Sequence, residues 1–267
     1  MDRQTQRHTP RLFWIIWGLT LSAALWGLLP WRTPAARPAA AQPAKGYVAL
    51  TFDDGPKAET TPILLDGLRQ RGVKATFFLI GQQAQTCPDL VRRMADEGHQ
   101  IGLHTWDHQD LSTMSQAELT AELEQTRQTL TALIGPEAFM IRPPYGFVSQ
   151  TLKESAGAPI LCWSVDTLDW KHRDPARITD TVLREVRDGA IVLMHDIFPT
   201  SVQAALTCAD RLLAEGYWLV TVEELFALRG ISPAPGQVWH ELPPQAVPSA
   251  GEPVPSISTH KRKGDLP

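Results

Sequence analysis

Short apolar runs alternate with longer amphipathic stretches through the middle of the chain. Each run is four to six residues long and largely apolar, which is typical of strands buried on both faces of a parallel sheet. The pattern predicts such strands at residues 47–52, 75–80, 100–103, 139–142, 160–165, 190–194 and 218–221.

The stretches between these runs repeat apolar residues at helical spacing. Ser115 and Glu118 have the spacing of a capping box at a helix start, and glycines such as Gly72 and Gly216 mark helix ends. The predicted helices are residues 60–71, 88–97, 115–134, 149–155, 175–187, 200–215 and 222–228.

Seven strand–helix units in succession predict an α/β fold with a parallel sheet whose outer face is covered by helices. This number of units favours closure into a distorted (β/α) barrel of seven or eight units, similar to a TIM barrel. An open doubly wound sheet is the alternative.

The N-terminal segment has the pattern of a membrane-directed sequence. Arg3, Arg7 and Arg11 precede an uncharged apolar run at residues 12–29, which predicts a cytoplasmic N-terminus at residues 1–11 and then a transmembrane signal-anchor. A cleaved signal peptide is the alternative, because an alanine triplet further along offers small residues for cleavage. We therefore expect the rest of the chain outside the cytoplasm, either held at the cell membrane by a single pass or secreted.

Two further segments have a composition that disfavours packing. Residues 30–45 are rich in Pro and Ala and predict an extended linker. Residues 232–267 contain many prolines without sustained periodicity and predict a disordered tail. The globular domain is therefore expected at residues 46–231.

Charge and cysteine content limit the partners and the cross-links. The formal net charge is −4, without the basic surface that nucleic-acid binders carry, so nucleic acid is not an expected partner. We expect a monomer that binds a carbohydrate polymer and, through its N-terminal segment, a membrane. Cys87, Cys162 and Cys208 match no zinc-binding spacing and allow at most one disulfide, so we interpret them as small buried hydrophobic residues.

Polar residues that can do chemistry follow the ends of the predicted strands. Asp53 and Asp54 follow the first strand, His104 and His108 the third, and His195 the sixth. The carboxyl ends of barrel strands meet at one rim, so these side chains are expected in one cleft. Two imidazoles with the carboxylate of Asp54 form a set that binds zinc and leaves positions open for water and substrate.

Each of these residue types also has an ordinary structural explanation. Asp-Gly-Pro is a common turn, a lone His-x₃-His pair is often two surface histidines, Arg142 could cap a strand end, and Asp169 could cap a helix. All these explanations would have to coincide at successive strand ends, which favours a single functional site. His99, His172 and His240 belong to no such set.

Five segments, in order, resemble the motifs of the polysaccharide deacetylases, the NodB-homology or carbohydrate esterase family 4 enzymes. The resemblance covers residues 45–228 and implies a NodB-type distorted (β/α) barrel. The segments are Thr51-Phe52-Asp53-Asp54-Gly55-Pro56, His104-Thr105-x-x-His108, Arg142-Pro143-Pro144-Tyr145, Asp166-x-x-Asp169-Trp170 and Leu193-Met194-His195.

The resemblance implies a metal site and a general base. Asp54, His104 and His108 would hold a divalent cation, with Zn²⁺ expected before Co²⁺ or Ni²⁺. Asp53 would be the general base and Arg142 would orient it. The cation and the guanidinium should both lower the pKa of that base and keep it ionised.

The remaining motif residues would serve the leaving group and the acetyl group. His195 would be the general acid, and its partner Asp169 should raise the pKa of the imidazole and keep it protonated. Tyr145 would offer its backbone N–H to the oxyanion. Trp170 and Leu193 would line the pocket for the acetyl methyl group.

The expected activity is metal-dependent hydrolysis of N-acetyl groups on a polysaccharide, with release of acetate. Peptidoglycan N-acetylglucosamine is the first expected substrate, given the location outside the cytoplasm, and chitin oligosaccharides or O-acetylated xylan are alternatives. A glycosidase using Asp53 and Asp169 would need no metal and would release new reducing ends. A non-catalytic carbohydrate-binding barrel is the alternative from a different class.

Overall fold

The computed structural model describes residues 45–244 of the chain. The strands in this part are β1 (Gly46–Asp53), β2 (Thr76–Leu79), β3 (Gln100–Leu103), β4 (Ile160–Leu161), β5 (Val165–Asp166), β6 (Ile191–His195), β7 (Tyr217–Leu219) and β8 (Val238–Trp239). The α-helices are α1 (Thr61–Arg71), α2 (Gly81–Thr86), α3 (Pro88–Asp96), α4 (Gln116–Ile134), α5 (Gln150–Ser155), α6 (Asp169–His172), α7 (Pro175–Glu185), α8 (Pro199–Ala214) and α9 (Val222–Leu228). Two short 3₁₀ turns are η1 (Leu111–Thr113) and η2 (Pro144–Gly146).

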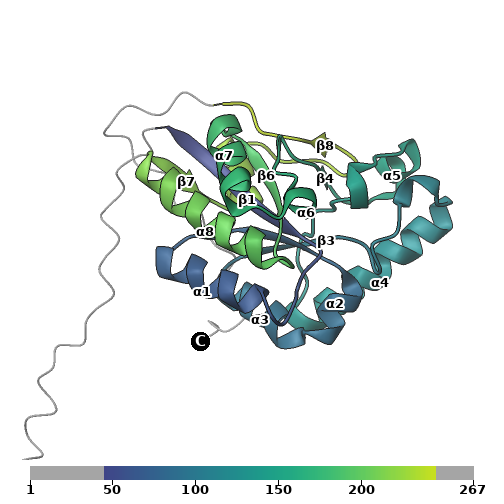
Figure 1. Ribbon diagram of the computed structural model, residues 1–267. Helices are drawn as coiled ribbons and strands as arrows, with labels where there is room; N and C mark the ends of the chain where they lie inside the picture. The colour runs from purple at the N-terminus through teal and green to yellow at the C-terminus, as the bar shows by residue number, and fades with distance from the viewer. Residues whose placement is uncertain (1–44, 245–267) are drawn as a thin grey trace, which may run out of the picture. The chain divides into compact units, whose positions relative to one another are not determined.

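The named strands pair only in parallel, and β1 lies at the centre of the sheet (Figure 1). The strand order is β3-β2-β1-β6-β5, and β7 pairs with the first residues of β1. Thr51 of β1 has Thr76 of β2 and Leu193 of β6 as its register partners. Parallel strands joined by helices are the arrangement in which continuous apolar strands are buried on both faces.

The pairing continues around the sheet through single residues. Leu103 at the end of β3 forms a bridge to Ile141, and Ile141 forms a second bridge to Ile160 in β4. Residues 160–166 then lead from β4 to β5, which pairs with β6. Single-residue bridges and this continuous segment thus connect the two edges of the sheet, as in the predicted distorted barrel.

Apolar side chains fill the inside of the sheet and the space beneath the helices. Phe52 of β1 and Phe77 of β2 stack with their ring centroids 5.3 Å apart. Helix α8 packs against α1 and α7, and α4 packs against α2 and α3 (Figure 1). Burial of each large apolar side chain stabilises the fold by roughly 1.5–3 kcal/mol relative to exposure.

Local signals in the sequence set several helix ends. The predicted capping box is present at α4, where the backbone N–H of Ser115 donates to Glu118 over 2.9 Å and the Ser115 hydroxyl accepts from the Glu118 N–H over 3.4 Å. A second capping box joins Thr221 and Glu224 at the start of α9. Gly72 ends α1 with φ of 63°, a left-handed conformation that glycine adopts without steric cost.

Two predicted strands differ from the structure. Residues 139–142 form only the single bridging residue Ile141 rather than a strand. Pro143 and Pro144 follow directly, and a proline has no N–H to extend a ladder. The strand predicted at residues 160–165 divides into β4 and β5, because the segment changes partner between Cys162, which donates to Trp239, and Ser164, which donates to Ile191.

The C-terminal boundary and two helices also differ. Residues 232–244, which the composition assigns to a disordered tail, contain β8, paired with β4, and the buried side chain of Leu242. A few apolar residues separated by prolines show no periodicity, so the sequence pattern does not reveal this strand. Helices α2 and α6 are likewise too short to show a helical period.

Several predictions concern parts of the chain outside residues 45–244. They include the cytoplasmic N-terminus at residues 1–11, the apolar run at 12–29, most of the linker, and the end of the tail. Among the residues that the structure does describe, no helix has the length and apolar content needed to span a membrane.

Candidate metal and catalytic site

The carboxyl ends of the parallel strands bring the predicted site residues together. Asp53 is the last residue of β1 and His195 the last residue of β6, while His104 directly follows β3. Parallel neighbours end at the same edge of a sheet, so side chains from segments far apart in sequence converge there. The predicted site residues therefore meet at this edge.

Asp54, His104 and His108 form the cluster that can hold a cation. One ligand atom from each residue lies within 4.8 Å of the others. The Nε2 atoms of both histidines lie 3.3 Å from Oδ1 of Asp54. That oxygen is buried and has no hydrogen-bond partner, an arrangement that costs free energy unless a cation or a protonated imidazole satisfies it. The donor set and its spacing fit a divalent metal with two imidazoles and one carboxylate.

The backbone at this cluster is held in a conformation that most residues avoid. Asp54, Thr105 and His108 have φ values of 72°, 65° and 67°. Left-handed conformations at residues other than glycine cost about 1–3 kcal/mol and collect at functional sites. The rest of the fold therefore stabilises a geometry that presents these side chains to a common point.

The hydrogen bond of His104 fixes which ring nitrogen is free. Its Nδ1 lies 2.7 Å from the backbone carbonyl oxygen of Arg142. A carbonyl can only accept, so Nδ1 carries the proton, and in the neutral ring Nε2 keeps a lone pair facing Asp54. This orientation is the one that a metal-ligating imidazole requires.

Charge interactions within the cluster shift its pKa values. Burial alone would raise the pKa of Asp54, but the close contact with His104 and its charge, with the charges of His195 and His108, lower it to about 2. Burial lowers the pKa of His108, and the neighbouring His104 lowers it further. Asp54 is therefore ionised at neutral pH, and the neutral form of His108 is favoured. Both are the forms in which these groups bind metals.

Arg142 is fully buried and holds Asp53. Its NH1 donates to Oδ1 of Asp53 over 2.8 Å and to the hydroxyl of Thr51 over 2.7 Å. The remaining guanidinium nitrogens donate to the carbonyl oxygens of Leu161 and Cys162 over 3.3 and 3.0 Å. These contacts come from two segments of the barrel, β1 and the end of β4, so they fix the position of the Asp53 carboxylate and keep its second oxygen available.

His195 is held by Asp169 through two hydrogen bonds. Its Nδ1 lies 2.7 Å from Oδ1 of Asp169, and its backbone N–H donates to Oδ2 over 2.8 Å. The hydroxyl of Ser201 also donates to Oδ2, over 2.6 Å. Burial alone would lower the pKa of His195, but the hydrogen bond and charge of Asp169 outweigh it and raise the pKa to about 9. The imidazole is therefore protonated at neutral pH and can act as a proton donor.

The three residues predicted to contact substrate lie in different environments. The ring of Tyr145 lies edge-on to His108, with centroids 4.9 Å apart. Leu193 is buried in β6, next to the site strand β1, and its carbonyl accepts from Thr167 over 2.8 Å. Trp170 is half exposed on the first turn of α6, directly after Asp169.

Three residues of the site were missed by reasoning from the sequence. Thr51 contacts Arg142, Ser201 contacts Asp169, and Asp196 is fully buried directly after His195. Asp196 accepts from the Thr61 hydroxyl, and its Oδ1 lies where a side chain on Gly55 would have to be. Burial and the negative charge of Asp54 raise the pKa of Asp196 to about 7. The position of Thr51, a polar residue within an apolar strand, could have indicated its role in the site. Nothing in the local sequence around Ser201 indicated its contact with Asp169.

Other titratable groups remain outside the site, as expected. His99 is buried, and its Nδ1 accepts from the Ala75 N–H over 3.1 Å. Cys162 and Cys208 are buried and unpaired, as predicted for small hydrophobic residues, and Cys87 is half-buried and also free.

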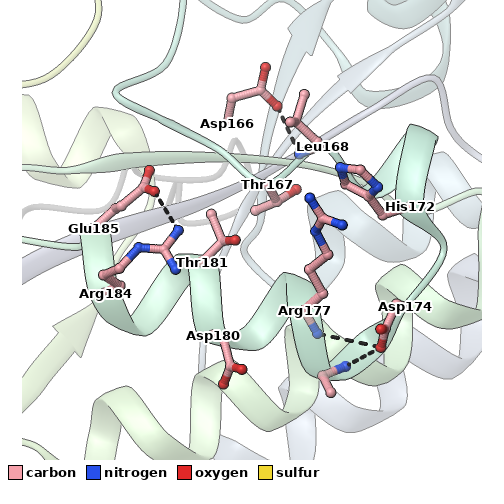
Figure 2. A pocket seen from close by; sticks show the side chains of 11 residues that line it. Asp166, Thr167, Leu168, His172, Asp174, Arg177, Asp180, Thr181, Arg184 and Glu185 are labelled. Carbon is pink, nitrogen blue, oxygen red and sulfur yellow. Dashed lines mark hydrogen bonds and ion pairs between the residues drawn. The ribbon is translucent and has the colours of Figure 1, made fainter.

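A separate polar cavity of about 460 Å³ lies between the end of β5 and helix α7 (Figure 2). His172, Arg177 and Asp166 contribute to its lining, and Asp174 there caps α7 by accepting from two backbone N–H groups. Asp166 is the one motif residue that lines this cavity, and none of the residues predicted to bind metal, catalyse or contact substrate does so. The chemistry therefore belongs to the sheet edge and not to this cavity.

The sheet edge combines three chemical capacities. It can hold a divalent cation, it can accept a proton from water at Asp53, and it can donate a proton from His195. A metal-assisted hydrolysis in which a poor leaving group must be protonated uses all three.

Sequence comparison relates this arrangement to known proteins. A model of the family described as "Polysaccharide deacetylase" matches residues 40–158, a range that includes Asp53 and Tyr145 and ends before Asp169. The peptidoglycan-N-acetylglucosamine deacetylase PgdA of Listeria monocytogenes is 44% identical over 179 residues, which are 67% of this chain and 38% of PgdA. This chain thus spans well under half the length of that relative.

Two further comparisons cover most of the related protein. The chitooligosaccharide deacetylase of a Bradyrhizobium species is 41% identical over 61% of this chain and 76% of that protein. The structure of the peptidoglycan deacetylase PdaC from Bacillus subtilis is similar with a TM-score of 0.68 at 36% identity, over 70% of this chain and 93% of that chain.

Proposed function

Because this chain belongs to the polysaccharide deacetylase family, we propose that it is a metal-dependent enzyme that hydrolyses N-acetyl groups of a polysaccharide and releases acetate. The observation that carries the proposal is the cluster of Asp54, His104 and His108 beside the pair formed by Asp53 and Arg142. We propose peptidoglycan N-acetylglucosamine as the substrate, since a relative at 44% identity is named for that activity.

Asp54, His104 and His108 would hold the cation, which we propose to be Zn²⁺, with Co²⁺ or Ni²⁺ as substitutes. Two imidazoles and one carboxylate leave positions open for water and substrate, as catalytic zinc sites do. When bound, the cation supplies Lewis acidity, which lowers the pKa of water and polarises the acetyl carbonyl.

Asp53 would act as the general base. Its Oδ1 is occupied by Arg142, and its Oδ2 lies 3.8 Å from Nε2 of His104, so the second oxygen faces the metal cluster. From that position it can take a proton from a water that attacks the acetyl carbon. The hydrogen bond from the guanidinium holds the Asp53 carboxylate in position throughout.

His195 would act as the general acid. Its Nε2 lies 3.9 Å from Oδ2 of Asp54, so the proton-bearing ring adjoins the metal cluster. Asp169 keeps the imidazole protonated and correctly turned, so it can protonate the amine as the carbon–nitrogen bond breaks.

Tyr145, Trp170 and Leu193 would bind the acetyl group. The backbone N–H of Tyr145 would donate to the oxyanion, while the side chains of Trp170 and Leu193 would enclose the methyl group. Such donors contribute most when they are aimed at charge that develops in the transition state.

We further propose that residues 12–29 anchor the protein and that residues 1–11 are cytoplasmic, which would place the catalytic domain outside the cytoplasm as a monomer. The supporting pattern is the apolar run after three arginines, together with the cell-wall substrate that the family relationship favours. A cleaved signal peptide would instead give a secreted enzyme.

The experiment that tests the proposed function is an assay of acetate release from peptidoglycan, chitin oligomers and acetylated xylan by purified protein. Acetate from peptidoglycan, and its loss in Asp53→Asn protein, would support the proposal. Greater acetate release from chitin oligomers or xylan would show that one of these polymers, and not peptidoglycan, is the preferred substrate. New reducing ends without acetate would indicate a glycosidase, and polymer binding with no product would indicate a binding protein; either result would contradict the proposal.

A further inference from the structure

Two aromatic side chains beside the metal cluster are exposed although they are large and apolar. Tyr145 is 59% exposed and Phe147 is 51% exposed. Their ring centroids lie 5.8 Å apart with an angle of 39° between the planes, and the Tyr145 ring is in contact with His108. We call these two rings the aromatic shelf. The proposed hydrolysis of the acetyl group does not use the side chain of Phe147.

The shelf is built on a hydrogen-bonded turn. The N–H of Gly146 donates to the carbonyl of Pro143 over 3.1 Å, and the N–H of Phe147 donates to Pro144 over 3.3 Å. Tyr145 has φ of 62°, a left-handed conformation that costs free energy in a residue other than glycine. The turn therefore maintains an unfavourable backbone angle while the ring it carries stays exposed.

Trp163 supports this turn. A side chain on Gly146 would lie 2.8 Å from the tip of the Trp163 ring, so the backbone of the turn rests directly on the indole. Trp163 in turn lies 5.8 Å from the guanidinium of Arg142, which holds Asp53. The shelf is thus placed relative to the reacting groups by a continuous set of contacts.

The size of the shelf distinguishes between classes of partner. A fully buried aromatic side chain removes roughly 150–250 Å² from water, so two half-exposed rings can offer about 200 Å². A stable protein interface needs about 800 Å² on each partner, which is several times more. One sugar ring, with its flat face of C–H groups, matches the smaller area, and a polymer must continue past the unit that reacts.

We propose that the aromatic shelf of Tyr145 and Phe147 binds a second pyranose ring of the substrate, next to the unit that carries the scissile acetyl group. This inference rests on the proposed function, because it takes the metal cluster as the position of the reacting unit. It makes the enzyme selective for oligomers over single sugars, with Phe147 contributing to binding and not to bond cleavage.

The test is a direct measurement of binding that does not depend on turnover. Calorimetry compares the affinity for a pentamer of N-acetylglucosamine with that for the monosaccharide, in an Asp53→Asn background that leaves the ligand intact. Phe147→Ala should lower the ratio of pentamer to monosaccharide affinity about tenfold, the loss typical of truncating an aromatic anchor. Phe147→Trp should restore the ratio, because it keeps a flat ring at the same place.

The matched control is Ile63→Ala, which truncates a residue 57% exposed on α1, outside the site. It should leave the affinity ratio unchanged. An unchanged affinity ratio in Phe147→Ala protein would contradict the proposed role of the aromatic shelf. An equal fall of the ratio in Ile63→Ala protein would contradict it as well. Acetate release is assayed separately in protein with Asp53 intact, so failure of the proposed function would be seen there and not in this ratio.

Discussion

Asp53 and His195 are register partners across the parallel strands β1 and β6. The proposed base and the proposed acid are therefore 142 positions apart in sequence yet adjacent at one edge of the sheet. Asp53 is held by Arg142 and His195 by Asp169, so each group has its own charged partner. A guanidinium holds the proposed base in place, and a carboxylate keeps the proposed acid protonated, so the two groups are suited to opposite proton transfers.

The pH dependence of activity should reveal the effect of Asp169 on the pKa of His195. Asp169 raises the pKa of His195 against the opposing effect of burial, so Asp169→Asn should lower this pKa. The imidazole would then lose its proton at lower pH, and the alkaline limb of the kcat/KM profile should move down by roughly one unit or more. Asp180→Asn changes an acid that lines the separate polar cavity and should leave the limb in place. An unmoved limb in Asp169→Asn protein would contradict the role of His195 as the acid.

Removing Arg142 should affect stability as well as activity. Arg142→Met leaves Asp53 buried without its partner, and breaking a buried pair in this way costs about 3–5 kcal/mol. Chemical denaturation should show that loss in the free energy of unfolding. Arg92→Met removes a surface ion pair with Asp89 and should change stability by less than about 1 kcal/mol. Equal losses of stability in the two variants would show that the pair of Arg142 and Asp53 does not stabilise the fold.

Metal affinity should depend on His108. Loss of an outer contact to a metal ligand typically weakens binding about 10–100-fold, and His108→Ala removes a ligand itself, so the loss should be at least that large. Competition with a chromophoric chelator measures it directly. His172→Ala is the matched control, because His172 lies at the separate polar cavity. Retention of full affinity in His108→Ala protein would remove His108 from the metal site.

His99 should make stability fall in mild acid. Burial, with smaller effects from nearby charges, lowers its pKa in the folded protein from 6.5 to about 4. The unfolded chain then binds a proton more tightly than the folded chain, so stability is present above pH 6.5 and is lost as the pH falls. Between pH 7 and pH 5 the loss from this residue should be about 2 kcal/mol. His99→Asn keeps an acceptor for the Ala75 N–H but does not titrate. The variant should therefore lose about 2 kcal/mol less stability than the wild-type protein between pH 7 and pH 5. An identical loss in both proteins would contradict the role of His99.

The sequence predicted the chemical residues better than the contacts that hold them. Asp54, His104 and His108 could be proposed as metal ligands because they have the spacing of such ligands and follow buried strands. Ser201 and Asp196 were not, because their roles depend on the tertiary contacts of β6 and α8 and not on local pattern.

The same distinction applies to the fold. Long periodic helices such as α4 were predicted with their caps, whereas β8 was missed because its pairing with β4 involves residues 78 positions apart in sequence. The pairing of Asp53 with His195 depends on the strand order, which periodicity does not contain. Only the convergence of strand ends could be inferred.

The most direct test of the central claim is acetate release from peptidoglycan by one preparation of the protein in three states. The native protein, the same protein after removal of metal with EDTA, and the stripped protein after addition of Zn²⁺ or Co²⁺ are assayed side by side. We predict activity, loss of activity, and recovery. Acetate release that continues unchanged after the metal has been removed would contradict the assignment of Asp54, His104 and His108 as a catalytic metal site.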